Sequence, residues 1–250
     1  MMKRVFEPAR RSLLDVIRKN LRTADRVTYI TRIVYIGEYV GSHIDLEKKM
    51  ESVINDLKAD YVNISISGLL LVYPQYYVHV LEASEEIVYK HLDGLYSNQH
   101  GDCKLKKAIF LPSHHHVHQR FFTEWFHVYT IPPTLLEKLE SHEMTEIQTQ
   151  VSNCLKKVYT LCDNIGNTVR DFSVPMKDVV RNISGNVARL FPESTVLEYL
   201  LNVNCPVLFT AEEFLKVYAT VPLVNLYSEY LQYQKNVSLY GVHEICVIYR

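Results

Sequence analysis

Two apolar runs joined by a tight turn constrain the fold of this chain more than any other feature. They lie in SGLLLVYPQYYVHVLEAS, between Ser67 and Ser84, and they meet at a tyrosine-proline turn. Runs of this length and composition, bounded by turn residues, predict the two strands of a β-hairpin. The alternation of the second strand turns His79 toward the interior. We therefore expect a sheet with this hairpin in its middle and a histidine in its core.

Single helices and further strands flank the hairpin. A strand is predicted over Val27–Gly37, followed by a helix that Asp45 caps. After the hairpin Ser84 caps a second helix, and strands follow over CKLKKAIFLPS, from Cys103, and over HVYTIP, from His127. Each helix has one apolar face, formed by Leu46, Met50, Val53, Ile54 and Leu57 in the first, and by Ile87, Val88, His91, Leu92 and Leu95 in the second.

This order of elements, β-α-β-β-α-β-β, predicts an α+β domain of the ferredoxin-like type, with one sheet and two helices on one of its faces. We place this domain at residues 27–130, after a basic arm at residues 1–26. Residues 131–250 are expected to form a helical extension that covers the other face of the sheet, and a tyrosine-rich tail.

The extension begins with a heptad pattern. Thr145–Asp171 contains no proline, and its apolar seam predicts one long helix. The seam either pairs with a helix of a partner protein or lies on its own domain. Further helices are predicted over Val179–Leu190, Ser194–Leu201 and Thr210–Tyr218, the last with a capping box. The seam positions are Ile147, Val151, Cys154, Val158, Leu161 and Ile165.

Charge and cysteine content limit the functional classes. The formal net charge of -1 gives no global field toward nucleic acid. The five cysteines include no C-x-x-C pair, which indicates free thiols in a reducing compartment. The start, MMKRVFEPARRSLL, has no apolar signal segment, and no run is long enough to span a membrane, so we expect a cytosolic protein. No Walker or G-x-G-x-x-G loop is present.

Basic residues recur in the first segment, with Arg10, Arg11, Arg18 and Lys19 among them. Apolar residues at helical spacing run along the other side, so the segment predicts a basic amphipathic helix. Such a helix either lies on an acidic partner or a membrane surface, or packs on its own domain with a solvated basic face.

Two polar features are weighed as sites. His114, His115, His116 and His118 form the cluster HHHVH, and histidine clusters can bind zinc. No cysteine or carboxylate lies at ligand spacing, so we interpret the cluster as a solvated loop. Glu82 is the most plausible partly buried carboxylate, and we interpret it as a strand-end acid that accepts hydrogen bonds from loop amides.

Three motifs resemble those of BLUF domains, blue-light sensors that use FAD. Ile66–Leu71 resembles their I-T-G-L-L-L, Val80–Ala83 their V-L-E-G, and Arg120–Trp125 their R-x-F-x-x-W. The order of strands and helices agrees over about Val27–Tyr129. The resemblance implies a BLUF-like sheet with a site for a flavin.

The residues that the resemblance assigns to this site depart from the pattern. Tyr35 and Trp125 match the family, but His79 replaces a glutamine and His127 stands at the methionine position. The asparagine position falls near Asp60-Tyr61, with Asn63 displaced toward the strand. An imidazole differs from an amide in its reach and in its donor and acceptor pattern. We therefore expect no FAD or other cofactor and no catalysis.

Beyond the first 25 residues, most of the sequence resembles the testis-expressed protein 47 family, including FPESTVLEYLL and FLKVYATVP near the end. That resemblance implies a protein of motile cilia and sperm flagella. We expect a structural or adaptor subunit of the axoneme, in a radial spoke or a doublet-associated complex, that binds axonemal proteins through its basic arm, heptad helix or tail. The alternatives are an FAD- or other cofactor-binding sensor, and a hydrolase or transferase of unknown type.

Overall fold

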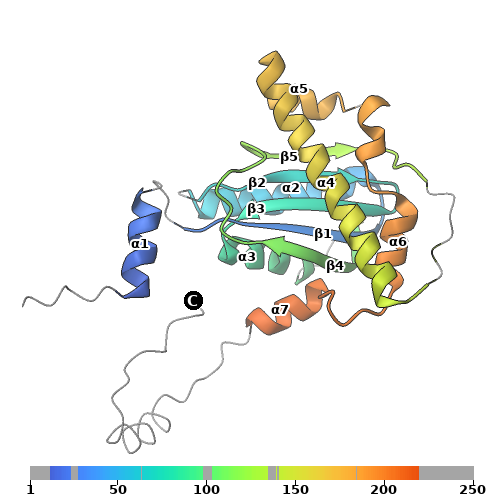
Figure 1. Cartoon of the computed structure of the whole chain (residues 1–250), viewed down its shortest axis with the longest axis horizontal. Helices are drawn as coiled ribbons and strands as arrows, with labels where there is room; N and C mark the ends of the chain where they lie inside the picture. The colour runs from blue at the N-terminus through green and yellow to red at the C-terminus, as the bar shows by residue number, and fades with distance from the viewer. Residues whose placement is uncertain are drawn as a thin grey trace, which may run out of the picture. The chain divides into compact units, whose positions relative to one another are not determined.

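The structure is a computed structural model that describes residues 12–23, 28–62, 64–97, 103–134, 139, 141–183 and 185–219. Figure 1 shows the arrangement of its elements. The strands are β1 (Thr31–Val40), β2 (Ser67–Val72), β3 (Tyr76–Ala83), β4 (Lys104–His114) and β5 (Trp125–Tyr129). The α-helices are α1 (Leu13–Thr23), α2 (His43–Asp60), α3 (Glu85–Tyr96), α4 (Met144–Phe172), α5 (Met176–Arg181), α6 (Ser194–Asn202) and α7 (Ala211–Ala219), and a 3-10 helix, η1, covers Gly185–Leu190.

The strands form one sheet in the order β4-β1-β3-β2-β5. β1 pairs antiparallel with β3 and β4, and β2 pairs antiparallel with β3, whereas β5 lies parallel to β2. The first four strands, with α2 and α3, follow the β-α-β-β-α-β order of the ferredoxin-like fold, and β5 adds an outer strand beside β2. The predicted α+β, ferredoxin-like class is therefore confirmed.

The register of the sheet lines up the residues of the candidate site. The hairpin turns at Pro74 as predicted, and its pairing puts Leu70 opposite His79. His79 in turn lies opposite Tyr35 of β1, and Leu70 lies opposite His127 of β5. Directly paired residues point to the same face of a sheet. Tyr35, His79 and His127 therefore share one face.

Gly68 is required where β2 lies between β3 and the start of β5. Its φ is +155°, and a Cβ at this position would lie 2.1 Å from the Val80 carbonyl oxygen. Its N–H donates to the Glu124 carbonyl at 3.1 Å, and its partner residue on β5 is Trp125. Only glycine permits this close approach, which brings Trp125 onto the same face as His79.

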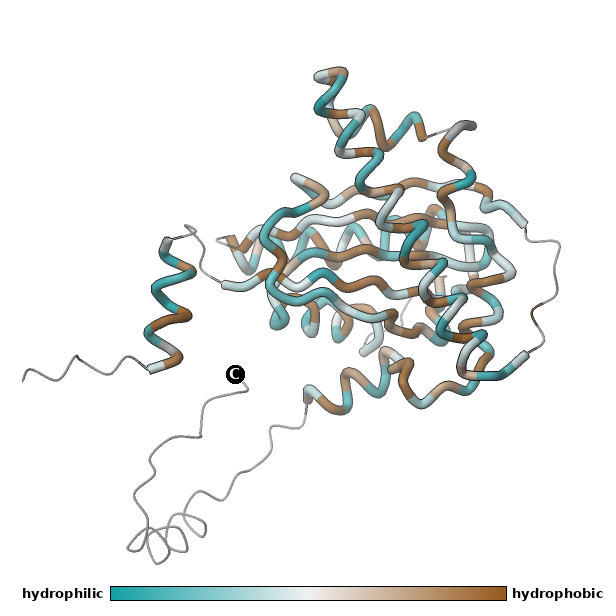
Figure 2. The backbone as a smooth tube through the Cα atoms, viewed as in Figure 1, coloured by the Kyte–Doolittle hydropathy of each residue, from teal (hydrophilic) through white to brown (hydrophobic). Residues whose placement is uncertain are grey.

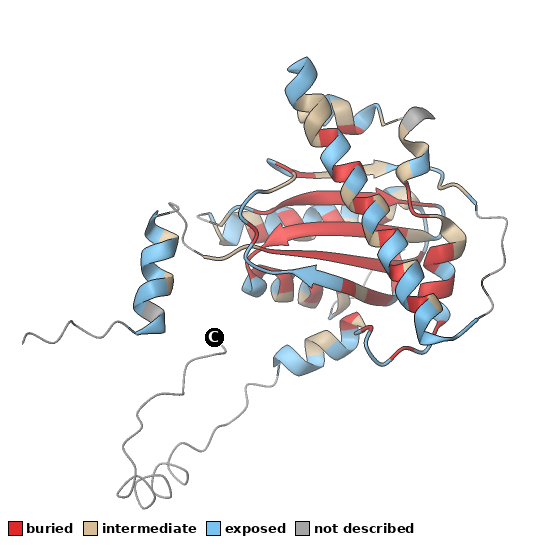
Figure 3. Cartoon of the chain, viewed as in Figure 1, coloured by how far each residue is buried: buried red, intermediate tan, exposed pale blue. Residues whose placement is uncertain are grey.

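Helices cover both faces of the sheet. On one face, α2 and α3 pack on buried sheet residues that include Tyr35, Leu70 and Leu81. On the other, α4 and α6 pack on residues that include Val34 and Val80. Figure 3 shows the central strands buried and each flanking helix exposed on its outer side, and the hydropathy pattern in Figure 2 follows the same division. The prediction that the C-terminal helices cover the second face is correct.

The heptad seam of α4 lies on this sheet. All six predicted seam positions are buried in the core cluster that contains Val34 and Val80. The seam is thus occupied by the chain's own strands, and the alternative that it pairs with a partner helix is wrong. These positions are Ile147, Val151, Cys154, Val158, Leu161 and Ile165.

Several predicted boundaries are wrong. The first strand begins at Thr31 rather than Val27, and the last begins at Trp125 because β2 pairs with it from that residue. Ser42, not Asp45, caps α2, since its side chain accepts from the N–H groups of the first turn. The helix predicted over Val179–Leu190 is instead α5 followed by η1. α5 ends at Arg181, and the residue that caps it is Asn182, a type that favours turns over helix interiors.

Residues 1–215 form one compact unit, and residues 216–250 form another. The predicted boundary near residue 130 stays a prediction. At the start of α7 the predicted capping box is present, because the Thr210 N–H donates to the Glu213 carboxylate and the Glu213 N–H donates to the Thr210 hydroxyl. Arg10, Arg11 and the tyrosine-rich tail lie outside the described residues, whereas Arg18 and Lys19 belong to α1. No helix in the described part of the chain is both long enough and apolar enough to cross a membrane.

Candidate functional site

Four side chains from four elements form a hydrogen-bonded row on the face that α2 and α3 cover. His91 Nε2 lies 2.8 Å from the Tyr35 hydroxyl, which lies 2.7 Å from His79 Nδ1. Trp125 Nε1 donates to His79 Nε2 at 2.8 Å. Tyr35, His79 and His91 are fully buried, and Trp125 is nearly so. We call these four residues the histidine row.

Hydrogen-bond chemistry fixes the direction of the row. An indole N–H only donates, so His79 Nε2 accepts, and a neutral imidazole then carries its proton on Nδ1. His79 Nδ1 therefore donates to the Tyr35 hydroxyl, which in turn donates to His91 Nε2. Every bond thus points from Trp125 toward His91, and both ring nitrogens of His79 are in use.

The row ends at His91 Nδ1, which has no hydrogen-bond partner within the described residues. Burial lowers the pKa of His91 to about 3. Burial, followed by the nearby His91, lowers the pKa of His79 well below its usual value. Burial also raises the pKa of Tyr35 well above its usual value. All three groups are consequently neutral near pH 7, so the row holds no charged base, acid or nucleophile.

Apolar side chains fill the space between the row and the two helices. Met50 and Ile54 of α2, with Ile87 and Leu92 of α3, have no exposed surface and pack in the same cluster as Tyr35. A large planar ligand in this place would have to displace side chains that are now packed in the core. The inner side of α2 and α3 thus serves as core.

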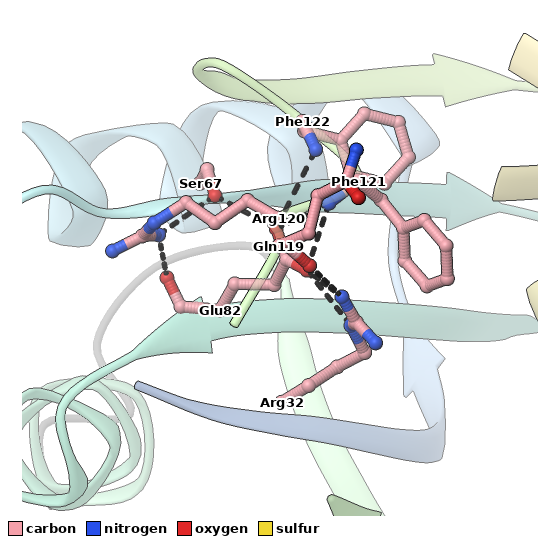
Figure 4. Close-up of polar contacts among 7 residues, drawn as sticks. All are labelled: Arg32, Ser67, Glu82, Gln119, Arg120, Phe121 and Phe122. Atoms are coloured by element: carbon pink, nitrogen blue, oxygen red, sulfur yellow. Dashed lines mark hydrogen bonds and ion pairs between the residues drawn. The ribbon is translucent and has the colours of Figure 1, made fainter. Parts of the chain in front are cut away.

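A second polar cluster centres on Glu82 at the end of β3 (Figure 4). The Glu82 carboxylate, which is fully buried, accepts from Arg32 Nε at 2.7 Å and forms an ion pair with Arg32 Nη2 at 2.6 Å. It also accepts from the Ser67 hydroxyl at 2.9 Å and from the Phe121 N–H at 3.0 Å. Buried charges are stable only when paired and hydrogen-bonded in this way. The interpretation of Glu82 as an acid bound to loop amides is confirmed.

Arginines extend this cluster into the connection between β4 and β5. Arg120 Nη1 donates to the Ser67 hydroxyl at 2.8 Å and to the Glu82 carbonyl at 2.6 Å. The Arg32 guanidinium lies 3.8 Å from the centre of the Phe121 ring, a cation–π distance, and its Nη2 donates to the Gln119 carbonyl at 2.9 Å. The cluster fixes the connection to three strands, and this positions the start of β5 and hence Trp125.

The comparison with protein families decides which family this chain belongs to. A sequence model of the family described as testis-expressed protein 47 matches residues 29–220. The chain belongs to the testis-expressed protein 47 family. The match runs from the residues just before β1 into the residue after α7, so it includes the histidine row, the Glu82 cluster and both helical layers.

Solved structures similar to this member of the testis-expressed protein 47 family include one whose title names a BLUF domain. One titled BlrP1 BLUF is 16% identical, covering 41% of this chain and 66% of that chain with a TM-score of 0.31. A Klebsiella pneumoniae BlrP1 complex is 17% identical (40% and 24% coverage, TM-score 0.31), and a bacterial light-regulated adenylyl cyclase is 18% identical (62% and 42%, TM-score 0.34). The chain spans about a quarter of the Klebsiella structure. The fold assignment rests on strand order and register, since these TM-scores are too low to support it.

The described residues of this family member do not fit a flavin in this arrangement. Tyr35, His79 and Trp125, which the BLUF resemblance assigns to flavin contacts, hydrogen-bond to one another and to His91. An isoalloxazine would need polar partners, and both His79 nitrogens are occupied. Asn63, at the displaced asparagine position, lies outside the described residues.

The remaining predicted site residues lie apart from the row. His127 is partly exposed and lies 3.7 Å from the Glu47 carboxylate of α2, with its ring 5.5 Å from that of Trp125. In the histidine cluster, His114, His115, His116 and His118 are all exposed. His115 is near Glu85 and the Ser113 hydroxyl, at 3.1 and 2.9 Å. The described residues contain no group of three or more potential metal ligands close enough to hold an ion.

His91 is the functional residue that sequence reasoning missed. It was assigned to the buried side of its helix on spacing alone, with no partner. A histidine among four aliphatic positions of one helical face is itself a signal, because a buried imidazole needs a hydrogen-bond partner. The tyrosine that supplies this partner, Tyr35, lies on a strand far away in sequence, and only the tertiary fold brings the two together.

Proposed function

We propose that this protein is a non-enzymatic structural or adaptor subunit of the axoneme in sperm flagella or other motile cilia, held in a radial spoke or a complex on the doublet surface. Its family is named for expression in testis, where cells build flagella. The proposal includes the absence of catalysis and of a bound cofactor.

The observation that carries the proposal is the closed histidine row. In a sensor or an enzyme the polar groups of the interior face a ligand. Here Tyr35, His79 and Trp125 bind one another, and apolar side chains of α2 and α3 pack over them. Within the described residues, only His91 Nδ1 of the row is left without a partner. An interior whose site residues are paired with one another is suited to presenting outer surfaces to neighbours.

Fractionation of sperm tests the location. Demembranated sperm are extracted first with detergent, then with high salt, and the protein is followed with a specific antibody. We expect it to stay with the axoneme through detergent and to leave, if at all, with salt together with spoke or doublet-surface proteins. A soluble glycolytic enzyme and tubulin serve as the two reference markers. Complete release by detergent alone would refute the axonemal proposal.

Spectroscopy tests the absence of a cofactor. The purified protein is expected to show no visible flavin absorbance, either as isolated or after incubation with FAD and gel filtration. The His79→Gln variant, which restores the amide found in BLUF sensors, provides the comparison. A stoichiometric yellow chromophore with a light-induced spectral shift in the unaltered protein would establish the sensor alternative instead.

A further inference from the structure

Among the residues that the structure describes, none bonds the main-chain groups on the outer edge of β5. The parallel pairing with β2 includes bonds from the Gly68 N–H to Glu124 and from the Thr130 N–H to Val72. This phase directs the N–H and C=O groups of the even-numbered β5 residues toward β2 and those of Trp125, His127 and Tyr129 away from it. β5 is the last strand on this side of the sheet in the described chain. Its outward groups therefore match the backbone of one more strand.

The opposite edge of the sheet, formed by β4, is protected against pairing, whereas the edge of β5 is not. β4 carries Lys104, Lys106 and Lys107, and its Phe110 N–H donates to the Phe209 carbonyl at 2.8 Å. Lysines and covering segments are the usual protection of edge strands against pairing. β5 reads WFHVY and contains no lysine, glutamate or proline. An unprotected edge in a protein that protects the other edge indicates a pairing site.

Helices flank β5 on both sides and limit what can approach it. On the α2 side, the His43 and Tyr129 rings stack at 4.1 Å, and Glu47 lies near His127. On the other side α5 contacts β5, with Met176 next to Thr123. Figure 1 shows the C-terminal end of α4, and α5 beside it, extending past β5. The free edge is therefore flanked by α2 and α5, which both contact β5.

We propose that β5 accepts an extended segment of a partner protein, which adds to the sheet as a further strand beside β5. The partner segment would carry apolar side chains at alternate positions, to pack on the α5 side with Phe126 and Val128, which are only partly buried. This inference deepens the proposed function, on which it rests for its cellular setting, because it names the surface through which the adaptor holds a neighbour.

A second copy of the chain fits this edge less well. Five residues of strand extend only about 17 Å, and edge-to-edge pairing of that length buries far less than the roughly 1,200–2,000 Å² of a stable interface. A single extended segment needs only the length of β5 and lies between the two helices that contact this strand, α2 and α5.

Paired variants at Tyr129 test the site. Tyr129→Pro removes an outward N–H, whereas Tyr129→Thr removes the same side chain and keeps that N–H. The strand bonds to β2 are unaffected by either change, so both variants should melt within a few degrees of the unaltered protein. His127→Lys is a second variant that should still fold, because the lysine would lie near the Glu47 carboxylate. It adds to β5 the type of charge that protects edge strands.

The probe is a phage-displayed library of random dodecapeptides, selected on the unaltered full chain. We expect enriched peptides to alternate apolar residues, and to bind Tyr129→Pro and His127→Lys about tenfold more weakly than Tyr129→Thr. Peptide binding should also slow amide exchange at His127 and Tyr129, which exchange rapidly in the free protein. Equal binding to Tyr129→Pro and Tyr129→Thr, or slow exchange of these amides without peptide, would overturn the proposal. So would a concentration-dependent dimer in sedimentation that only Tyr129→Pro abolishes, because the occupant would then be a second copy.

The cellular experiment separates this inference from the proposed function. Tagged Tyr129→Pro and Tyr129→Thr chains are expressed in sperm and extracted as above. Retention of Tyr129→Thr with loss of Tyr129→Pro supports both proposals. Retention of both variants contradicts the strand site and leaves the axonemal function standing. Release of the unaltered protein by detergent contradicts the axonemal function, while the peptide measurements still decide the strand site.

Discussion

An imidazole that accepts from Trp125 and donates to Tyr35 has no nitrogen left for a ligand. His79 is held in this state because a tryptophan N–H cannot accept a hydrogen bond, so only one tautomer satisfies the row. A glutamine at the same position would offer one donor and one acceptor that exchange places when the amide rotates. The histidine removes that freedom, and the interior becomes a fixed structural element.

Removing the Tyr35 hydroxyl should destabilise the fold without changing its packing volume. In Tyr35→Phe, the His79 Nδ1–H and His91 Nε2 lose their shared partner in a fully buried place. We expect a loss of about 1–3 kcal/mol in the free energy of unfolding, measured by urea denaturation. Tyr77→Phe is the matched control: its hydroxyl bonds only Tyr96, which is partly exposed. If Tyr35→Phe lost no more free energy of unfolding than Tyr77→Phe, the hydrogen bonds assigned to Tyr35 would be contradicted.

The buried histidines should make stability fall in mild acid. Their folded-state pKa values lie below 6.5, with His91 at about 3, so the unfolded chain binds more protons below pH 6.5. Their stabilisation is complete above pH 6.5 and is lost as pH falls, and for His91 the loss continues down to about pH 3. Urea titrations at several pH values measure this loss. His91→Leu should reduce the slope of unfolding free energy against pH by the contribution of one histidine. An unchanged slope would contradict a neutral, buried His91.

At the scale of elements, Glu82 joins segments that are distant in sequence. It receives Arg32 from β1, Ser67 from β2 and the Phe121 N–H from the connection between β4 and β5. Because all the donors converge on one carboxylate, the connection is held against three strands. The position of Trp125 depends on this connection, so the two polar clusters are linked through β5.

Glu82→Gln should therefore be costly. The substitution leaves the Arg32 charge buried without its counter-charge and sets an amide N–H against a donor, for a loss of about 3–5 kcal/mol. Glu38→Gln is the control, since the Glu38–Lys106 pair lies at the surface, where a loss of about 0–1 kcal/mol is expected. Chemical denaturation gives both values. Similar losses in the two variants would contradict the proposed role of Glu82 in holding the β4–β5 connection.

Truncation on α4 tests whether its seam lies on the sheet in solution. Leu161 is fully buried there, so Leu161→Ala should cost about 2–5 kcal/mol. Lys156→Ala, on the exposed side of the same helix, should change stability by less than about 0.5 kcal/mol. If the seam were instead reserved for a partner, the isolated protein would tolerate both changes equally.

Local patterns predicted the elements well, and tertiary contacts decided where prediction failed. The spacing of Leu46, Met50 and Ile54 gave α2, and that of the α4 seam gave its buried side, because periodicity reflects burial directly. Spacing alone did not place the seam on the sheet rather than on a partner helix. The burial of His79 followed from strand alternation, but its partners Tyr35 and Trp125 come from two other strands, which no local pattern connects.

Considered as a whole, residues 1–215 make one unit in which a single sheet carries a helical layer on each face. The BLUF-like part and the helical extension share β1, β2 and β3, whose side chains alternate between the two cores. Neither layer can lose its helices without exposing the sheet. The extension is therefore part of the folding unit that contains the histidine row.

This sharing predicts one cooperative transition. Trp125 is the only tryptophan in the sequence and lies on the α2–α3 side, so its fluorescence reports that layer. Far-UV circular dichroism is sensitive to α4, the long helix of the other layer. The two denaturation curves should coincide, and Leu161→Ala should shift both to the same lower midpoint. Separate midpoints would mean that residues 131–215 fold independently.

The parallel pairing of β5 with β2 has a consequence for biosynthesis. A parallel partner cannot be reached through a short turn, so β2 must wait while α3, β4 and the long connection leave the ribosome. Until Trp125 has been synthesised, His79 lacks the N–H that donates to its Nε2, and the edge of β2 beside which β5 will pair is unoccupied. The last strand therefore completes the sheet only after its other four strands have been made, and α4 and α6 can cover the second face only later still.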